Sequence, residues 1–124
     1  MYSERLLDHF QNPRNVGRLE PPGLAVEVEN PACGDVMRLE ARLEGDRVKE
    51  TRFQTKGCTA SIAAGSAVTE LIGGRSLAEI GRLQAADVEG AVGGLSAESK
   101  HAAVLAVDAI KALVAAAKAA RSQA

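Results

Sequence analysis

The chain has 124 residues, which is enough for one domain, residues 1–124, with a single modest core. Its formal net charge is −1, so it lacks the excess of Lys and Arg that is typical of nucleic-acid-binding proteins. One Tyr and two Phe leave few aromatic rings on which bases could stack. No apolar run reaches the roughly 18–20 residues that a membrane span requires. We therefore expect a cytoplasmic domain that binds neither nucleic acid nor membrane.

The first predicted elements are a short helix and a loop. Residues 2–11 combine a candidate N-cap, Ser3, with apolar residues at helical spacing. The residues expected on the buried stripe of this helix are Leu6, Leu7 and Phe10. His9 lies on the same helix and is expected to be exposed or to pack, because an imidazole in this setting is more often structural than a ligand. Pro13 ends the helix, and residues 17–23 form a loop.

Three strands are predicted next. Residues 24–29 and 37–44 alternate between apolar and polar side chains, which is typical of a sheet with one solvated face. A third, more polar strand covers residues 48–55. Gly45 lies in the turn between the second and third strands, where a positive φ is tolerated. Short connections of this kind indicate an antiparallel meander.

The second half of the chain is predicted to be helical. A helix that follows Cys58 ends at Gly73-Gly74. Ser76 and Glu79 have the spacing of a capping box, which opens a short helix, and Asp87 is expected to cap another short turn.

The last helix is expected to begin between residues 96 and 99 and to run to about residue 120. Its expected apolar stripe consists of Val104, Val107, Ile110, Leu113, Val114 and Ala117. Strands that precede helices in this way predict an α+β fold, with a three-stranded antiparallel sheet and helices packed on one face.

Two cysteines carry the most distinctive chemistry, and in a chain without a signal peptide they indicate a reducing compartment and a metal or reactive thiol. Cys33 and Asp35 are two residues apart in extended chain, so their side chains can address one point as ligands of Zn²⁺ or iron. Gly34 lets the backbone bend and removes a side chain that would crowd the site. The alternative interpretation of this segment is an ordinary turn.

Cys58 lies at the predicted junction of the third strand and the following helix. Backbone N–H groups and the helix dipole favour negative charge there, and the thiolate is the form that binds metals. The alternative is a small buried apolar residue. His101 lies just inside the last helix and is expected to face the core, although a histidine at a helix start is usually a surface residue. All of these residues border element boundaries, which can meet at one end of the sheet.

The sequence resembles the NifU/IscU-type iron–sulfur cluster scaffold family along nearly its whole length. The segments that carry the resemblance are Tyr2-Ser3-Glu4, Asp8-His9-Phe10, Asn12-Pro13-Arg14-Asn15-Val16-Gly17, Pro31-Ala32-Cys33-Gly34-Asp35, Lys56-Gly57-Cys58 and Asp108-Ala109-Ile110-Lys111. The resemblance implies a three-stranded antiparallel sheet packed by helices. It also implies a scaffold that is not an enzyme, which accepts sulfur from a cysteine desulfurase. With iron it builds a labile [2Fe–2S] cluster and passes it to iron–sulfur acceptor proteins, and Zn²⁺ often occupies the same site.

By this resemblance Cys33 and Cys58 match the first two cluster cysteines of the family, and Asp35 matches the aspartate that keeps the cluster labile. His101 matches the histidine that precedes the third cysteine, but the next residue here is Ala102. Cluster or metal binding would then rest on Cys33, Asp35, Cys58 and His101, and only the two cysteines could accept sulfur. Two sulfur, one nitrogen and one oxygen donor also suit a tetrahedral Zn²⁺ site.

Two further alternatives remain. The chain could be a zinc-binding family member that modulates a desulfurase without building a cluster. It could also be a thiol enzyme with Cys58 as nucleophile and His101 as base, although no oxyanion-binding signature accompanies them. Residues 95–100 lack the Leu-Pro-Pro-Val-Lys stretch by which many bacterial members bind a chaperone, so the sequence does not favour chaperone-assisted transfer.

Overall fold

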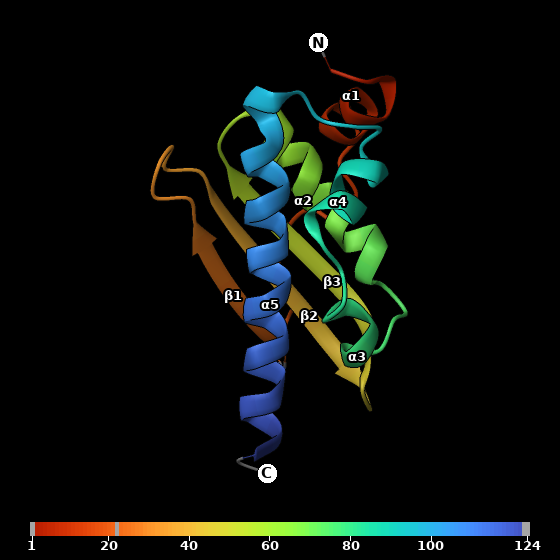
Figure 1. Cartoon of the computed structure of the whole chain (residues 1–124). Coiled ribbons are helices and arrows are strands. Elements are labelled where there is room, and N and C mark those ends of the chain that lie inside the picture. The colour runs from red at the N-terminus through yellow and green to blue at the C-terminus, as the bar shows by residue number, and fades with distance from the viewer. Residues whose placement is uncertain (1, 22, 123–124) are drawn as a thin grey trace.

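The computed structural model describes residues 2–21 and 23–122, in which a three-stranded sheet carries helices on one face (Figure 1). The elements in chain order are α1 (Glu4–Gln11), β1 (Leu24–Glu29), β2 (Val36–Glu44), β3 (Arg47–Lys56), α2 (Thr59–Ile72), α3 (Leu77–Ile80), α4 (Ala85–Ala91), the 3-10 helix η1 (Ala97–Ser99) and α5 (Lys100–Ser122). This is the α+β architecture that the order of strands and helices predicts.

The sheet is an antiparallel meander in the order β1-β2-β3. Leu24 of β1 pairs with Ala41 of β2, and Met37 of β2 pairs with Thr55 of β3. The turn between β2 and β3 contains Gly45 with φ at +63°, as its position in the sequence predicts. Alternate residues of β2 therefore face the helices, and Met37 and Ala41 are fully buried there.

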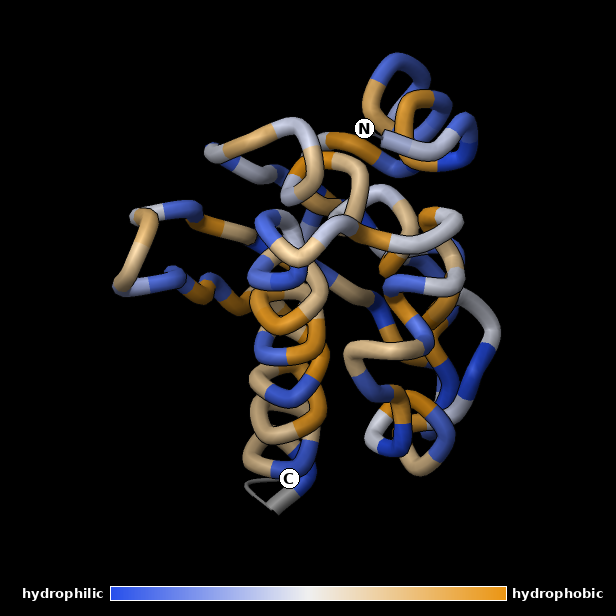
Figure 2. The backbone as a smooth tube through the Cα atoms, turned by 45° about the horizontal axis from the view of Figure 1, so that its top comes forward, coloured by the Kyte–Doolittle hydropathy of each residue, from blue (hydrophilic) through white to orange (hydrophobic). Residues whose placement is uncertain are grey.

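The helices divide the covered face of the sheet between them. Helix α5 packs on β1 and β2, α2 packs on β3, and α4 lies against both helices. Along α5, hydrophobic and hydrophilic residues alternate, as expected for a helix with one buried side (Figure 2). Gly65 allows the closest approach of α2 to the sheet, because a Cβ atom there would lie 2.5 Å from Cδ2 of Phe53.

The buried faces of α1 and α5 differ from the predicted ones. Val104 is 51% exposed. Leu7 and Phe10 are exposed at 37% and 38%, so the prediction that they are buried was wrong, because α1 faces α2 through Leu6 and His9. The buried residues of the first half of α5 are Ala102, Ala103, Leu105, Ala106, Val107, Ala109 and Ile110. The prediction of the stripe was wrong at Val104, because α5 meets the sheet, α2 and α4 largely through small residues, so alanines rather than large aliphatic residues mark its buried side.

Helix caps follow the sequence closely, with one correction. Ser76 and Glu79 form the predicted capping box. The 3-10 helix η1 begins at Ala97, within the predicted window of residues 96–99, whereas α5 itself begins at Lys100, one residue after that window. Asp87, however, is the third residue of α4 and not its cap. Its carboxylate accepts a hydrogen bond at 2.8 Å from the backbone N–H of Gln84, which is the capping residue.

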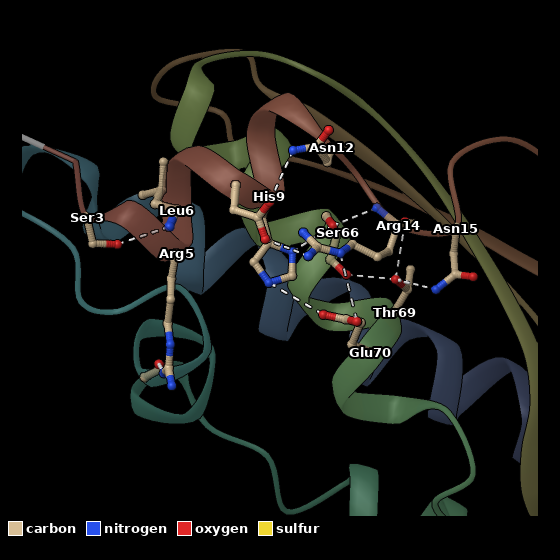
Figure 3. Close-up of polar contacts among 12 residues, drawn as sticks. Ser3, Arg5, Leu6, His9, Asn12, Arg14, Asn15, Ser66, Thr69 and Glu70 are labelled. Carbon is tan, nitrogen blue, oxygen red and sulfur yellow. Dashed lines mark hydrogen bonds and ion pairs between the residues drawn. The ribbon is translucent and has the colours of Figure 1, made fainter.

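Helix α1 is attached to α2 by a buried polar contact (Figure 3). Ser66 of α2 accepts the backbone N–H of Arg14 at 2.9 Å, so its own O–H is free to donate to Nδ1 of His9 at 2.8 Å. Nε2 of His9 then faces Glu70 at 3.5 Å. Because His9 is 7% exposed, it is a packing residue, which is one of the two outcomes the sequence predicts.

Among the described residues, none of the helices has the length and apolar character needed to cross a membrane.

Candidate functional site

Four chain segments meet at the end of the sheet where β3 stops and α5 starts, which is the upper end in Figure 1. They are the loop between β1 and β2, the junction of β3 and α2, the first turn of α2, and the first turn of α5. Cys33 and Asp35 come from the first of these segments, Cys58 from the second and His101 from the last. The tertiary structure thus gathers all four residues that the sequence marks as candidates.

The loop that carries Cys33 and Asp35 is a tight turn. Asn30 donates its backbone N–H to the carbonyl of Asp35 at 2.8 Å and accepts the N–H of Gly34 at 2.7 Å. Gly34 has φ at +77°, a conformation that favours glycine. A Cβ at Gly34 would meet no described atom within 4 Å apart from its chain neighbours. The prediction of a bend is confirmed, and the prediction that a side chain at position 34 would crowd the site is wrong.

The crowded glycine is Gly57. A Cβ atom there would lie 2.5 Å from Cγ of Asp35 and 2.7 and 2.8 Å from its two carboxylate oxygens. A Cβ atom essentially never lies so close to an atom to which it is not bonded, so the carboxylate of Asp35 fits against the backbone of residue 57 only because that residue has no side chain. Gly57 therefore fixes how close the loop comes to α2.

Asp35 is 8% exposed and its charge is compensated from α2. Ser61 donates its hydroxyl to Oδ2 of Asp35 at 2.7 Å, and the backbone N–H of Cys58 points to the same oxygen at 3.5 Å. The hydrogen bond from Ser61 lowers the pKa of Asp35; burial opposes this, and contacts with Cys58 and Cys33 add to it. The site thus holds a carboxylate, not a carboxylic acid, at neutral pH.

Cys58 is the N-cap residue of α2 and is half-buried, whereas Cys33 is exposed. The Sγ atom of Cys58 lies 3.4 Å from the hydroxyl of Ser61 and 3.5 Å from Nε2 of His101. Its position at the start of α2 is the one that the strand-to-helix pattern predicts. A thiolate at this point faces the positive end of the helix dipole.

His101 is oriented by the backbone of η1. Its Nδ1 lies 3.0 Å from the carbonyl oxygen of Glu98. A carbonyl oxygen can only accept, so Nδ1 carries a proton, and in the neutral ring Nε2 then presents the lone pair. Nε2 lies 3.5 Å from Sγ of Cys58 and 3.6 Å from Oδ2 of Asp35. This is the arrangement in which metal-binding histidines are usually held.

Two of the separations between the donor atoms match those between ligands of one metal ion. One ligand atom each from Cys33, Asp35 and His101 lie within 4.8 Å of one another, and Sγ of Cys58 is 3.5 Å from Nε2 of His101. Atoms bound tetrahedrally at about 2.0–2.3 Å from Zn²⁺ lie about 3.3–3.8 Å apart. The measured 3.5 and 3.6 Å separations fall in that range.

Ser61 and Gly57 belong to this site although neither was selected from the sequence. Ser61 is three residues after Cys58 in the first turn of α2, and this spacing directs its side chain back toward the helix N-terminus. This three-residue spacing after Cys58 is the feature of the sequence from which the role of Ser61 could have been predicted. The contact of Gly57 with Asp35 joins residues 22 positions apart and left no local pattern in the sequence.

A second polar cluster, Ser66, His9 and Glu70, has the order of a hydrolase triad but a different environment. Ser66 has no exposed surface, and its hydroxyl is occupied by Arg14 and His9. A substrate could not reach it. This cluster holds α1 on α2.

Comparison with known proteins places the chain in a family. The family described as "NifU-like N terminal domain" matches residues 1–124. The chain belongs to this NifU-like family. The family prediction made from the cysteine, histidine and N-terminal motifs is thereby confirmed. Relatives in this family are described as scaffold proteins, which agrees with the expectation of a scaffold and not an enzyme.

Relatives are similar to the chain over most of its length. The iron–sulfur cluster assembly scaffold protein IscU 1 of Archaeoglobus fulgidus is 40% identical over 111 residues, which cover 90% of this chain and 72% of that protein. The scaffold protein IscU of Haemophilus influenzae is 39% identical over 118 residues, which cover 92% of this chain and 93% of that protein.

Solved structures have the same fold. The structure of a SUF-system iron–sulfur cluster assembly scaffold protein, FiSufU, from Fervidobacterium islandicum AW-1 superposes with a TM-score of 0.72 at 20% identity, and covers 91% of this chain and 96% of that one. The NifU-like N-terminal protein of Brucella abortus gives a TM-score of 0.61 at 18% identity, covering 89% of this chain and 77% of that one. At such identities these structures establish the fold alone.

Proposed function

We propose that this member of the NifU-like family is a scaffold on which a labile [2Fe–2S] cluster is assembled and from which it is passed to acceptor proteins. Cys33, Asp35, Cys58 and His101 are its proposed ligands, within one domain of residues 1–124. The observation that carries the proposal is that ligand atoms of Cys33, Asp35 and His101 lie within 4.8 Å of one another, with Sγ of Cys58 3.5 Å from Nε2 of His101.

The donor set fits a cluster as cargo. Iron–sulfur clusters are held mainly by thiolates, and histidine replaces cysteine in Rieske centres. Here two thiols, one imidazole and one carboxylate provide four ligands. Since two of the four are oxygen or nitrogen donors, the cluster would be held more weakly than by four cysteines. Weaker binding favours transfer of the cluster to an acceptor protein.

Sulfur would reach the site from a cysteine desulfurase. Cys33 is exposed and Cys58 is half-buried. A persulfide on the desulfurase would therefore transfer its outer sulfur to Cys33 more readily than to Cys58. The two thiols are free, which agrees with a reducing, cytoplasmic location. Residues 95–100 lack the family's chaperone-binding stretch, so we expect transfer to acceptors without a dedicated chaperone.

A zinc-binding protein that modulates a desulfurase is the second candidate. The observation in its favour is the same donor set, since two sulfur atoms, one nitrogen and one oxygen suit a tetrahedral Zn²⁺ site, and Nε2 of His101 lies 3.5 Å from Sγ of Cys58 and 3.6 Å from Oδ2 of Asp35. Zn²⁺ bound there would be structural, because four protein ligands leave no open position.

Anaerobic purification followed by metal and acid-labile sulfide analysis separates the two candidates. A scaffold contains iron and sulfide, or gains them on reconstitution with ferrous iron, cysteine, a desulfurase and a thiol reductant that reduces the persulfide sulfur to sulfide, and then loses them to an apo-ferredoxin. The visible absorption of the cluster follows both steps. Zinc alone, with no cluster after reconstitution, would contradict the scaffold proposal and favour the zinc candidate.

The matched variants are Cys33→Ser and Cys58→Ser. Each is expected to abolish reconstitution, because one thiolate cannot anchor a cluster that needs two. Ser76→Ala serves as a control for general damage, since Ser76 caps α3 at the other end of the sheet. Full reconstitution of either cysteine variant would contradict the assigned ligands.

A further inference from the structure

Ser61 connects two of the proposed ligands that come from different parts of the chain. Its hydroxyl lies 2.7 Å from Oδ2 of Asp35 and 3.4 Å from Sγ of Cys58. Ser61 has no exposed surface, so the hydroxyl does not exchange its partners for bulk water. A buried hydroxyl without a partner would be costly, and both of its partners here are metal-ligand types.

The hydrogen bond restricts the carboxylate of Asp35. Gly57 closes one side of that carboxylate, and Ser61 holds Oδ2 from α2. The side chain of Asp35 is therefore fixed on two sides before any metal arrives. Preorganisation of this kind reduces the cost of binding, since the ligand does not have to be ordered when the metal enters.

The geometry points to Ser61 as the positioning residue of the site: its hydroxyl holds the Asp35 carboxylate where a metal ion can be shared with Cys58 and His101. This inference rests on the proposed function, because it assumes that Asp35 is a ligand. Ser61 acts through Asp35 and does not itself bind the metal. Partners of this type in metal sites change metal affinity by about 10- to 100-fold when they are removed.

The test is the affinity of the metal-free protein for Zn²⁺, measured by competition with a chromogenic chelator, for the wild type and Ser61→Ala. Alanine keeps the helix and removes only the hydroxyl. We expect Zn²⁺ to bind about 10- to 100-fold more weakly. With Co²⁺ as the probe, the absorption of the bound ion should also change, because the coordination geometry loosens.

The control is Ser66→Ala on the same helix. Ser66 is as deeply buried as Ser61 but bonds His9 and the backbone of Arg14. Loss of Ser66 is expected to lower the thermal stability while the Zn²⁺ affinity stays within about twofold of wild type. If both variants lower the affinity equally, Ser61 has only a structural role and the inference is wrong.

A double-mutant cycle with Asp35→Ala tests the route of action. If Ser61 acts through Asp35, then Ser61→Ala changes the affinity by less than about twofold when Asp35 is already alanine. A full loss in that background would overturn the inference.

Cys33→Ser and Cys58→Ser, measured alongside, separate the inference from the proposed function. If they reduce Zn²⁺ affinity and Ser61→Ala does not, only the inference is wrong. If neither cysteine variant changes the affinity, the proposed ligand set and the inference are both wrong.

Discussion

His101 is held by the carbonyl oxygen of Glu98, three residues before it, at 3.0 Å from Nδ1. This single contact requires a proton on Nδ1 and turns Nε2 toward Cys58 and Asp35. Because the carbonyl belongs to η1, the short helix that precedes α5 orients the histidine. The start of α5 is thus part of the site and not only of the fold.

Loss of a residue that only hydrogen-bonds to a metal ligand typically weakens metal binding by about 10- to 100-fold. We expect His101→Ala to weaken Zn²⁺ binding by more than this. The reason is that the substitution removes a ligand and leaves three. Chelator competition measures the effect. Lys100→Ala is the control, since Lys100 is exposed and pairs with Glu89 away from the site. An unchanged affinity in His101→Ala would exclude the histidine as a ligand.

We expect Asp35→Ala to lengthen the life of a reconstituted cluster and to slow its transfer. A carboxylate at the cluster opens a polar path for water and competing thiols, and alanine closes that path. The half-life against an iron chelator, measured anaerobically, checks this. Asp46→Ala, at the β2–β3 turn, is the control. A half-life equal to or shorter than that of the wild type would count against the role.

The stability of the fold is expected to fall as the pH drops, through His9. Burial lowers the pKa of His9, and the charge of Arg14 lowers it further, against the opposite influence of Glu70 and Asp8. The unfolded chain therefore takes up this proton at a higher pH than the folded protein does. The contribution of His9 to the free energy of unfolding is therefore fully present above about pH 6.5. It decreases as the pH falls from there through the pKa that His9 has in the folded protein.

Urea unfolding at pH 7.5 and at pH 5.5 measures this effect. His9→Gln, which does not titrate, should reduce the difference in unfolding free energy between the two pH values. If wild type and variant lose stability in parallel, another group is responsible.

The packing of α2 on β3 should not tolerate a side chain at Gly65. We expect Gly65→Ala to cost about 1–3 kcal/mol of unfolding free energy, because the new methyl group would overlap Phe53 and Thr55. Gly90→Ala in α4 is the matched control. A Cβ there meets no described atom within 4 Å, so alanine should be neutral or stabilise by about 0.5–1 kcal/mol. Equal effects of the two substitutions would contradict the packing argument.

Ala102 stands where the resemblance places the third cysteine of the family, and it is fully buried. Adjacent helix residues point about 100° apart, so a thiol at position 102 faces the core while His101 faces the site. In metal-free Ala102→Cys we expect alkylation of the new thiol to be much slower than that of the exposed Cys33.

Reconstitution of Ala102→Cys tests the choice between the two proposed functions. If the protein is a scaffold, opening of the first turn of α5 lets the third thiolate reach the site, and iron and sulfide per chain rise. Cluster content that stays near zero in both forms would favour the zinc candidate.

Local patterns in the sequence were sufficient to predict much of the fold. The alternation in residues 37–44 predicts which side of β2 is buried, and the capping box of Ser76 and Glu79 is a contact between residues three apart. Cys58 falls at the start of α2 for the same reason, since its neighbours change from strand to helix periodicity there. Such features depend on interactions between residues that are only a few positions apart, so they can be predicted from short stretches of sequence.

Only the tertiary structure decided how the site is built. Ser61 and Asp35 are 26 residues apart, and Cys58 and His101 are 43 apart, so nothing in either local segment specifies their contact. The exposure of Val104 and the burial of His9 were likewise settled by which neighbouring elements pack against α5 and α1. Periodicity identifies an amphipathic helix, but the direction of its buried face depends on what covers it, and that is determined by contacts between segments distant in the chain.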